Sequence, residues 1–102
     1  MFTVPKKLYK VILLYNCDIE LGEFQLFALK FFQFLYRLGA KNININLIGE
    51  GKLAYPIKGQ DTAQFVEIKL IISPKGINKF INFLNLDQNL LRHYTLKTNE
   101  KN

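Results

Sequence analysis

Cysteine and histidine each occur once in the chain, as Cys17 and His93, and tryptophan is absent. A single cysteine excludes an internal disulfide, and one Cys with one His cannot make a cysteine- or histidine-based zinc site. Cys17 follows a predicted strand and precedes a helix, with no catalytic partner nearby, so we interpret it as a packing residue. His93 is interpreted as structural or as lying next to a nucleic acid. We expect no metal and no cofactor.

Long apolar runs are also missing. The longest, residues 24–38, is interrupted by Gln25, Lys30, Gln33 and Arg37, and it is too short and too polar to cross a bilayer. The N-terminal end shows neither a signal-peptide pattern nor an Arg- and Ser-rich transit peptide. We therefore expect no membrane partner and a location inside a cell or organelle.

Acidic residues are outnumbered: 14 Lys and Arg oppose 8 Asp and Glu, which gives a formal net charge of +6. A small basic domain favours a polyanionic partner such as a nucleic acid, although a mildly basic surface alone has the same composition. The bias toward Lys, Asn, Ile, Phe and Tyr is typical of A+T-rich coding. It favours an organelle, a plastid before a mitochondrion, with a bacterial cytoplasm as the remaining possibility.

Hydrophobic periodicity divides the chain into six elements. An apolar strand covers 8–15, and a helix over 19–38 has Asp18 as its N-cap and Gly39 after its end. A strand over 42–57 bends at Gly49 and Gly51. The remaining elements are a polar turn over 58–63, a strand over 64–72, a helix capped by Ser73 with Pro74 in its first turn, a strand over 90–97 and a flexible tail over 98–102.

This order, β-α-β-β-α-β, predicts a ferredoxin-like α+β fold in which one domain, residues 1–102, has a four-stranded antiparallel sheet with two helices on one face. The alternation over 42–47 places Ile43, Ile45 and Leu47 toward the core. The Phe-rich helix is expected to bury its apolar side chains, and these include Phe27, Phe32, Phe34 and Tyr36.

The run Gly49-Glu50-Gly51-Lys52-Leu53-Ala54-Tyr55-Pro56-Ile57 is the most specific motif. Proline inside a strand pattern is unusual, because it cannot donate to a sheet ladder. With Tyr9 and Val11, Gly39-Ala40, the run 84–92 and Lys97, this motif resembles the bacterial-type small-subunit ribosomal protein S6 family over about residues 8–98. Members often carry two consecutive basic residues before the leucine, whereas here Gly51 precedes Lys52, and a pair of arginines is reduced to Leu91-Arg92.

The resemblance implies a non-enzymatic structural constituent of the small ribosomal subunit. It also implies binding to the central domain of small-subunit rRNA together with ribosomal protein S18, contacts with other small-subunit proteins, and no small-molecule substrate. Cations on or beside the strands are the candidate phosphate contacts, and Arg92 is the strongest because guanidinium binds phosphate bidentately. The candidate RNA-binding residues are Lys6, Lys7, Lys52, Lys58, Arg92 and Lys97, and the candidate protein contacts are Tyr55, Phe65 and Leu91.

Two other classes share this fold. An acylphosphatase-like enzyme needs an Arg and a phosphate-cradling loop after the first strand, but residues 16–19 read Asn-Cys-Asp-Ile, without Arg or Gly. A small-molecule regulatory module would bind a ligand and form a stable homodimer through its sheet.

Overall fold

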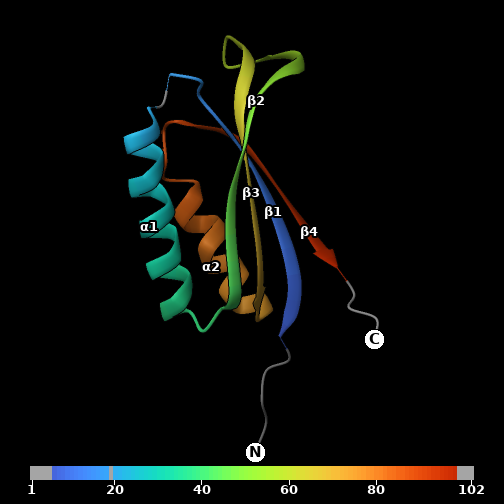
Figure 1. Cartoon of the computed structure of the whole chain (residues 1–102). Coiled ribbons are helices and arrows are strands. Elements are labelled where there is room, and N and C mark those ends of the chain that lie inside the picture. Colours follow the sequence, from blue (N-terminus) through green and yellow to red (C-terminus); the bar gives the residue numbers. More distant parts are fainter. Residues whose placement is uncertain (1–5, 19, 99–102) are drawn as a thin grey trace, which may run out of the picture.

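The structure is a computed structural model that describes residues 6–18 and 20–98 (Figure 1). The element order confirms the predicted β-α-β-β-α-β arrangement. The elements are β1 (Lys7–Tyr15), α1 (Leu21–Arg37), β2 (Lys41–Ile57), β3 (Gln60–Ile72), α2 (Pro74–Leu84) and β4 (Leu90–Thr98). Of the tail predicted over 98–102, Thr98 belongs to β4 and the rest lies outside the described residues.

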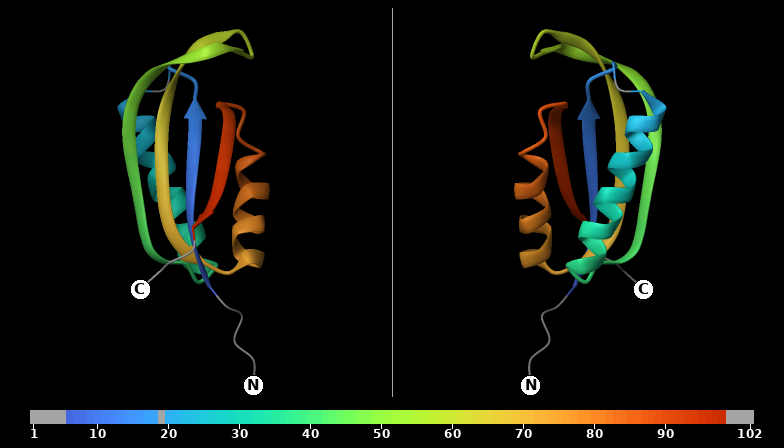
Figure 2. Two further views of the ribbon diagram at one scale, coloured as in Figure 1. Left: turned by 90° about the vertical axis from the view of Figure 1, so that its right-hand side faces the viewer. Right: turned by 90° about the vertical axis from the view of Figure 1, so that its left-hand side faces the viewer.

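The four strands form one antiparallel sheet in the order β2-β3-β1-β4. Both helices cover the same face of this sheet, and the other face is left open (Figure 2). Alternate residues of the central strands point to the helices, among them Val11, Leu13, Ile68 and Leu70, which have 0% exposed surface. They pack against Phe31, Leu35, Phe80 and Leu84 of the helices, and this confirms the predicted ferredoxin-like fold.

The two helices begin with different caps. Ser73 caps α2 as predicted, since its Oγ accepts the Gly76 backbone N–H at 3.1 Å. The prediction that Asp18 caps α1 is wrong. Glu20 is the N-cap, and it forms a capping box with Glu23. A reciprocal pair of carboxylates satisfies two backbone donors, which a lone Asp cannot do.

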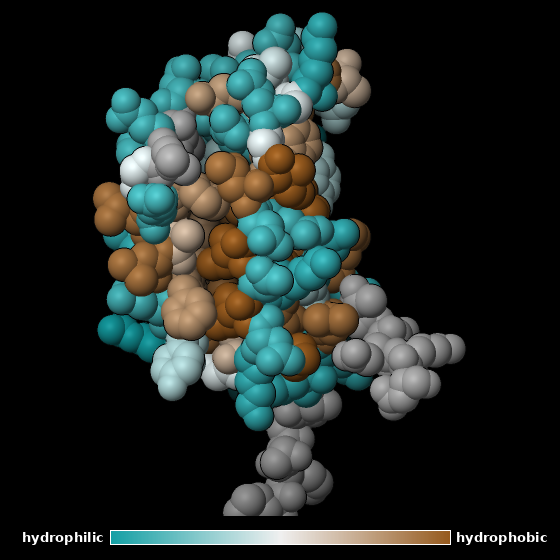
Figure 3. Space-filling model, viewed as in Figure 1, coloured by the Kyte–Doolittle hydropathy of each residue, from teal (hydrophilic) through white to brown (hydrophobic). Residues whose placement is uncertain are grey.

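Two predictions of burial are also wrong. Phe32 and Tyr36 on α1 are 45% and 70% exposed, because they lie on the flank of the helix that faces away from the sheet and α2. Leu47 is 42% exposed, because β2 is an edge strand that α1 covers incompletely, while Ile43 and Ile45 pack against the core as predicted. Hydrophobic side chains are visible over and beside α1 in Figure 3.

The β2–β3 hairpin forms a long arm that extends beyond the helices (Figures 1 and 2). Its turn is shorter than predicted, because Lys58 and Gly59 alone make it, with φ of 51° and 79°, and β3 already begins at Gln60. Two positive φ values identify a type I′ turn, whose twist matches the strands. The predicted bend is present at Gly49, where the register shifts after Leu47 and φ is 127°. It is absent at Gly51, which pairs with Ala63 in regular register and has no positive φ.

Candidate nucleic-acid interface

The open face of the sheet carries a second apolar cluster at the base of the arm. Its buried members are Leu14, Ile57, Ala63 and Leu91, and three half-buried side chains join them: Ile12, Leu53 and Phe65. These residues alternate along β1 and β3 with those of the main core, so they lie on the face that the helices leave uncovered. The cluster fixes the arm against the sheet.

Leu91 reaches this cluster because β4 contains a bulge. Leu14 pairs with Arg92, but Tyr15 pairs with Leu90, so Leu91 is the extra residue. A bulged residue leaves the alternation of its strand. Simple alternation along β4 would place Leu91 on the side of His93 and Thr95. The bulge instead places it in the open-face cluster, where it is 8% exposed. In this structure its side chain packs inside the cluster and offers little surface to a partner.

Arg92 lies at the edge of the cluster between two tyrosines. Tyr94 follows on the same face of β4, and Tyr55 comes from the arm; they are 46% and 60% exposed. The Tyr94 hydroxyl beside the guanidinium raises the pKa of Arg92, and the Tyr55 hydroxyl acts in the same direction. Arg92 thus remains cationic at every physiological pH. A planar cation between two exposed phenols can bind a phosphate and stack on a base.

The open face carries two further lysines that were not among the predicted RNA-binding residues, Lys10 on β1 and Lys69 on β3. Both lie near Glu67: Lys10 Nζ is 3.1 Å from its Oε2, and Lys69 Nζ is 4.0 Å from its Oε1. The shared carboxylate offsets part of their charge. Arg92 makes no ion pair within the described residues, so it is the less neutralised cation of this face.

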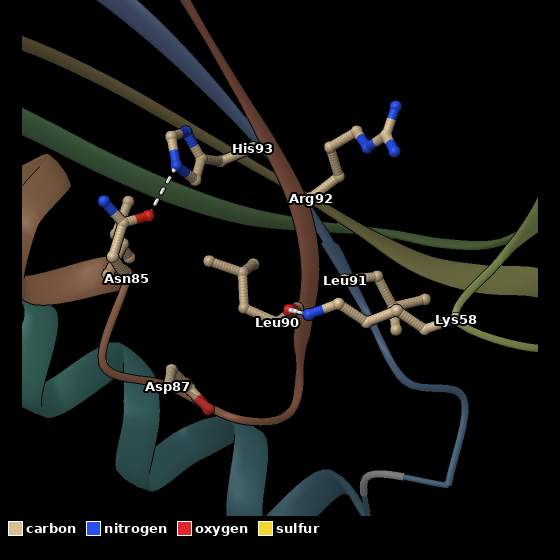
Figure 4. Close-up of a pocket in the computed structure, with 8 residues that line it drawn as sticks. Lys58, Asn85, Asp87, Leu90, Leu91, Arg92 and His93 are labelled. Atoms are coloured by element: carbon tan, nitrogen blue, oxygen red, sulfur yellow. Dashed lines mark hydrogen bonds between the residues drawn. The ribbon is translucent and has the colours of Figure 1, made fainter.

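Lys58 extends to the start of β4, and the Arg92 side chain points away from it (Figure 4). Its Nζ donates to the Leu90 carbonyl at 3.5 Å, across a depression of about 240 Å³ at the start of β4. On the other side of this depression, His93 Nε2 and Asn85 Oδ1 are 3.0 Å apart. His93 thus connects β4 with the end of α2, in agreement with a structural role.

The remaining predicted cations divide between other surfaces. Lys97 pairs with Tyr9, so it lies on the helix side of the sheet, near the end where β1 begins. Lys6 is at the same end, and its Nζ donates to the Gly39 carbonyl at 3.1 Å. Lys7, the next residue, is the first residue of β1. These three lysines lie at the opposite end of the sheet from the arm (Figure 1), and the structure does not bring them together with Arg92.

On the arm, Lys52 pairs with Thr62, whose Oγ1 accepts a hydrogen bond from Cys17 Sγ at 3.3 Å. Lys52 is therefore on the face opposite to Gly51 and Phe65 at that point of the hairpin. Tyr55 and Pro56 lie in a wide irregularity between Lys52 and Ile57, where the ladder to β3 is interrupted. This position explains how proline is tolerated within β2 and why Tyr55 projects from the arm.

Tyr94, Lys10 and Lys69 are the residues of this face that sequence reasoning missed. A signal for Tyr94 was available, because the alternation of β4 places it beside Arg92. Lys10 is a lone cation within an apolar strand, and such a residue at an outward position of a sheet is a candidate for a surface contact. Pairing of Lys10 and Lys69 through Glu67 depends on strand register, which the sequence does not give.

Neither helix is both long and apolar enough to cross a membrane. Within residues 6–18 and 20–98, no three His, Cys, Asp or Glu side chains gather as a group that could hold a metal ion.

Comparisons with known proteins agree with this architecture. The family model for ribosomal protein S6 matches residues 8–97. The small ribosomal subunit protein bS6c of Trieres chinensis is 28% identical over 88% of this chain and 94% of that protein. The bS6c protein of Phaeodactylum tricornutum is 24% identical over 82% of this chain and 86% of that protein. These plastid-type names agree with the plastid location favoured by the composition.

The fold also matches a solved structure, that of 30S ribosomal protein S6 from Thermotoga maritima. The TM-score is 0.82 at 17% identity, over 91% of this chain and 88% of that chain, so this likeness concerns the fold. The match of the family model, which covers most of the chain, confirms the family that the motif at 49–57 indicated. This chain belongs to the ribosomal protein S6 family, whose members are structural, non-enzymatic components of the small ribosomal subunit.

Proposed function

We propose that this protein binds small-subunit rRNA through the open face of its sheet at the base of the arm, as a non-enzymatic component of a plastid ribosome. The observation that carries this proposal is Arg92: it is exposed, it makes no ion pair within the described residues, and it lies near Tyr55 and Tyr94. Single-stranded and looped RNA offers phosphates that a free guanidinium can bind and unstacked bases that can stack on aromatic rings.

Ribosomal protein S18 is the protein partner that we propose for the adjoining surface, on the basis of the resemblance at 49–57. Tyr55 supplies an exposed aromatic ring there, and Phe65 a half-buried one. Aromatic side chains at an exposed apolar site are typical anchors of protein interfaces. Of the three contact residues predicted from the sequence, Tyr55 and Phe65 have side-chain surface that a partner could contact, whereas Leu91 is buried in the cluster against which Phe65 packs.

The RNA site is tested by measuring the affinity of the full chain for a central-domain fragment of small-subunit rRNA at several salt concentrations. Arg92→Ala is expected to weaken binding about tenfold and to lower the slope of log K against log salt by about one. Lys75→Ala, an exposed change on α2, is the matched control and should alter neither quantity.

Lys97→Ala distinguishes the two ends of the sheet. We expect it to leave RNA binding unchanged, because Lys97 lies on the helix side and far from the arm. If Lys97→Ala reduces the affinity and the salt slope while a folded Arg92→Ala variant does not, the RNA surface is at the other end and the proposal is wrong. For S18, Tyr55→Ala is expected to weaken association of the two purified proteins in analytical ultracentrifugation.

A further inference from the structure

A groove lies between α1 and α2, away from the open face of the sheet. It consists of two adjoining depressions of about 260 Å³ and about 220 Å³, which share Lys30 and Phe83. We call them together the interhelix groove. Along α1 it extends from Phe27 to Arg37, which corresponds to about 15 Å of helix. Figure 2 (right) shows the two helices in front of the sheet on this side.

The floor of the groove is aromatic and held in place. Phe34 and Phe83 stack with ring centroids 4.4 Å apart, and Phe27 stacks on Tyr15 at 5.4 Å. These phenylalanines are half-buried, so one side of each ring is fixed by the core while an edge remains accessible. At one end of the groove Leu86 is 80% exposed. A rigid apolar floor with an exposed leucine suits the apolar side chains of a partner.

The rim of the groove on α1 is cationic. Lys30 and Arg37 are exposed, and neither makes an ion pair in the part of the chain that the structure describes. Asp87 is the carboxylate of the lining, and it is already engaged: it accepts hydrogen bonds from the Tyr15 hydroxyl at 3.0 Å and from the Asn89 N–H at 2.9 Å. The two free cations are therefore available to a ligand.

We propose that the interhelix groove binds an acidic amphipathic peptide segment of another protein. Its apolar side chains would lie on the phenylalanine floor, and its carboxylates would pair with Lys30 and Arg37. This surface is separate from the proposed RNA site, because the sheet lies between them (Figure 2). The protein can then hold RNA on one side and a protein segment on the other.

Charge and ring geometry favour this occupant over two others. A second copy of the chain docked through the same groove would bring Lys30 and Arg37 near the same cations of its partner, and like charges at an interface oppose association. RNA would satisfy the cations but needs free ring faces for stacking. Phe34 and Phe83 cover one face of each other, and Phe80 and Phe31 also pack against this pair.

The test is an NMR titration of the isotope-labelled full chain with two designed helical peptides. Both have leucines at i, i+3 and i+7, and one is flanked by glutamates and the other by lysines. We expect the acidic peptide to produce saturable shifts confined to residues 27–37 and 83–87. The basic peptide should bind about tenfold more weakly, since each exposed charge pair contributes a fraction of a kcal/mol.

A charge-reversed variant gives the sharper result. Lys30→Glu with Arg37→Glu is expected to reverse the preference, so that the basic peptide binds more tightly than the acidic one. Lys75→Glu with Lys79→Glu makes the same change of charge on the exposed side of α2, outside the groove, and should preserve the original preference. Circular dichroism establishes that both double variants are folded.

Several outcomes would overturn the proposal. The acidic peptide could produce no saturable shift at millimolar concentration, or it could shift residues outside the groove. The wild-type chain could also bind both peptides equally. Concentration-dependent shifts of the groove residues in the chain alone would identify a second copy as the occupant. Shifts of the groove residues, and not only of the open face, on adding an RNA oligonucleotide would identify RNA as the occupant. The Arg92 experiment is independent, because the groove variants retain the whole open face.

Discussion

Replacement of Gly51 gives a direct test of the packing that holds the arm. The Phe65 ring lies over this glycine, so that a Cβ there would be 2.8 Å from Phe65 Cε1 and 3.2 Å from Cδ1. Gly51 is not among the residues with positive φ, which are Asn42, Lys58 and three other glycines. Its backbone therefore accepts a side chain without strain, and the cost of a substitution comes from contact with Phe65.

The magnitude follows from two opposing effects. An added methyl group in a packed site costs about 1–3 kcal/mol, and the lower half applies here because Phe65 is half-buried and its ring can move. Loss of glycine from a strand returns about 0.5–1 kcal/mol. We therefore expect Gly51→Ala to lower the free energy of unfolding slightly in the wild type. In a Phe65→Ala background it should raise that free energy by about 0.5–1 kcal/mol, since the contact is gone.

The assay is urea denaturation of the four proteins of this double-mutant cycle, with m-values compared. The matched control is Gly49→Ala, where no atom lies within 4 Å of the Cβ position but φ is 127°. This change should destabilise both backgrounds by similar amounts, because its cost is backbone strain. The same effect of Gly51→Ala in both backgrounds would refute the explanation by Phe65 contact.

Two further predictions concern the frame that carries the site. Tyr15→Phe removes the hydrogen bond to Asp87 Oδ2 from a buried position and should lower the free energy of unfolding by about 1–2 kcal/mol in urea denaturation; no change would mean that this bond contributes nothing. Burial, and then Asp87, raise the pKa of Tyr15 in the folded protein. The free energy of unfolding of the wild type should therefore be constant in this respect below about pH 10, the pKa of tyrosine in the unfolded chain, and should decline above it. The Tyr15→Phe variant should lack this decline. Ser73→Ala should lower the free energy of unfolding by about 1 kcal/mol, and Ser73→Asp should lower it much less, because Asp can also accept the Gly76 N–H. Both variants are measured by thermal unfolding, and equal losses would contradict a capping role.

The fold could be predicted from the sequence because local signals agree along most of the chain. The period of β3 places Val66, Ile68, Leu70 and Ile72 on one face, and the structure buries all four. Ser73 followed by proline marks the start of α2. The errors arose where tertiary context decides: Phe32 and Tyr36 belong to an apolar helix, but they lie on its outer flank, which the rest of the described structure leaves exposed.

The site was harder to predict because its residues come together through register and bulges. Nothing in the composition shows that Leu91 is the extra residue of a bulge, and that insertion sends its side chain into the open-face cluster. Tyr55 approaches Arg92 because β2 departs from the ladder between Lys52 and Ile57. Such irregularities depend on pairing between distant segments, and single-strand patterns do not contain them.

Strand geometry also decides which cations can act together. Arg92 and Lys97 are five residues apart on β4, and an odd separation places side chains on opposite faces of a sheet. One RNA surface cannot use both without wrapping around the edge of the molecule. This chain therefore has cations on both sides of its sheet. The open face has two exposed tyrosines beside Arg92, whereas the helix side has rings stacked on one another beside Lys30 and Arg37. The first arrangement suits nucleotides and the second suits an acidic protein segment, so reversing charge on one side should leave binding on the other intact.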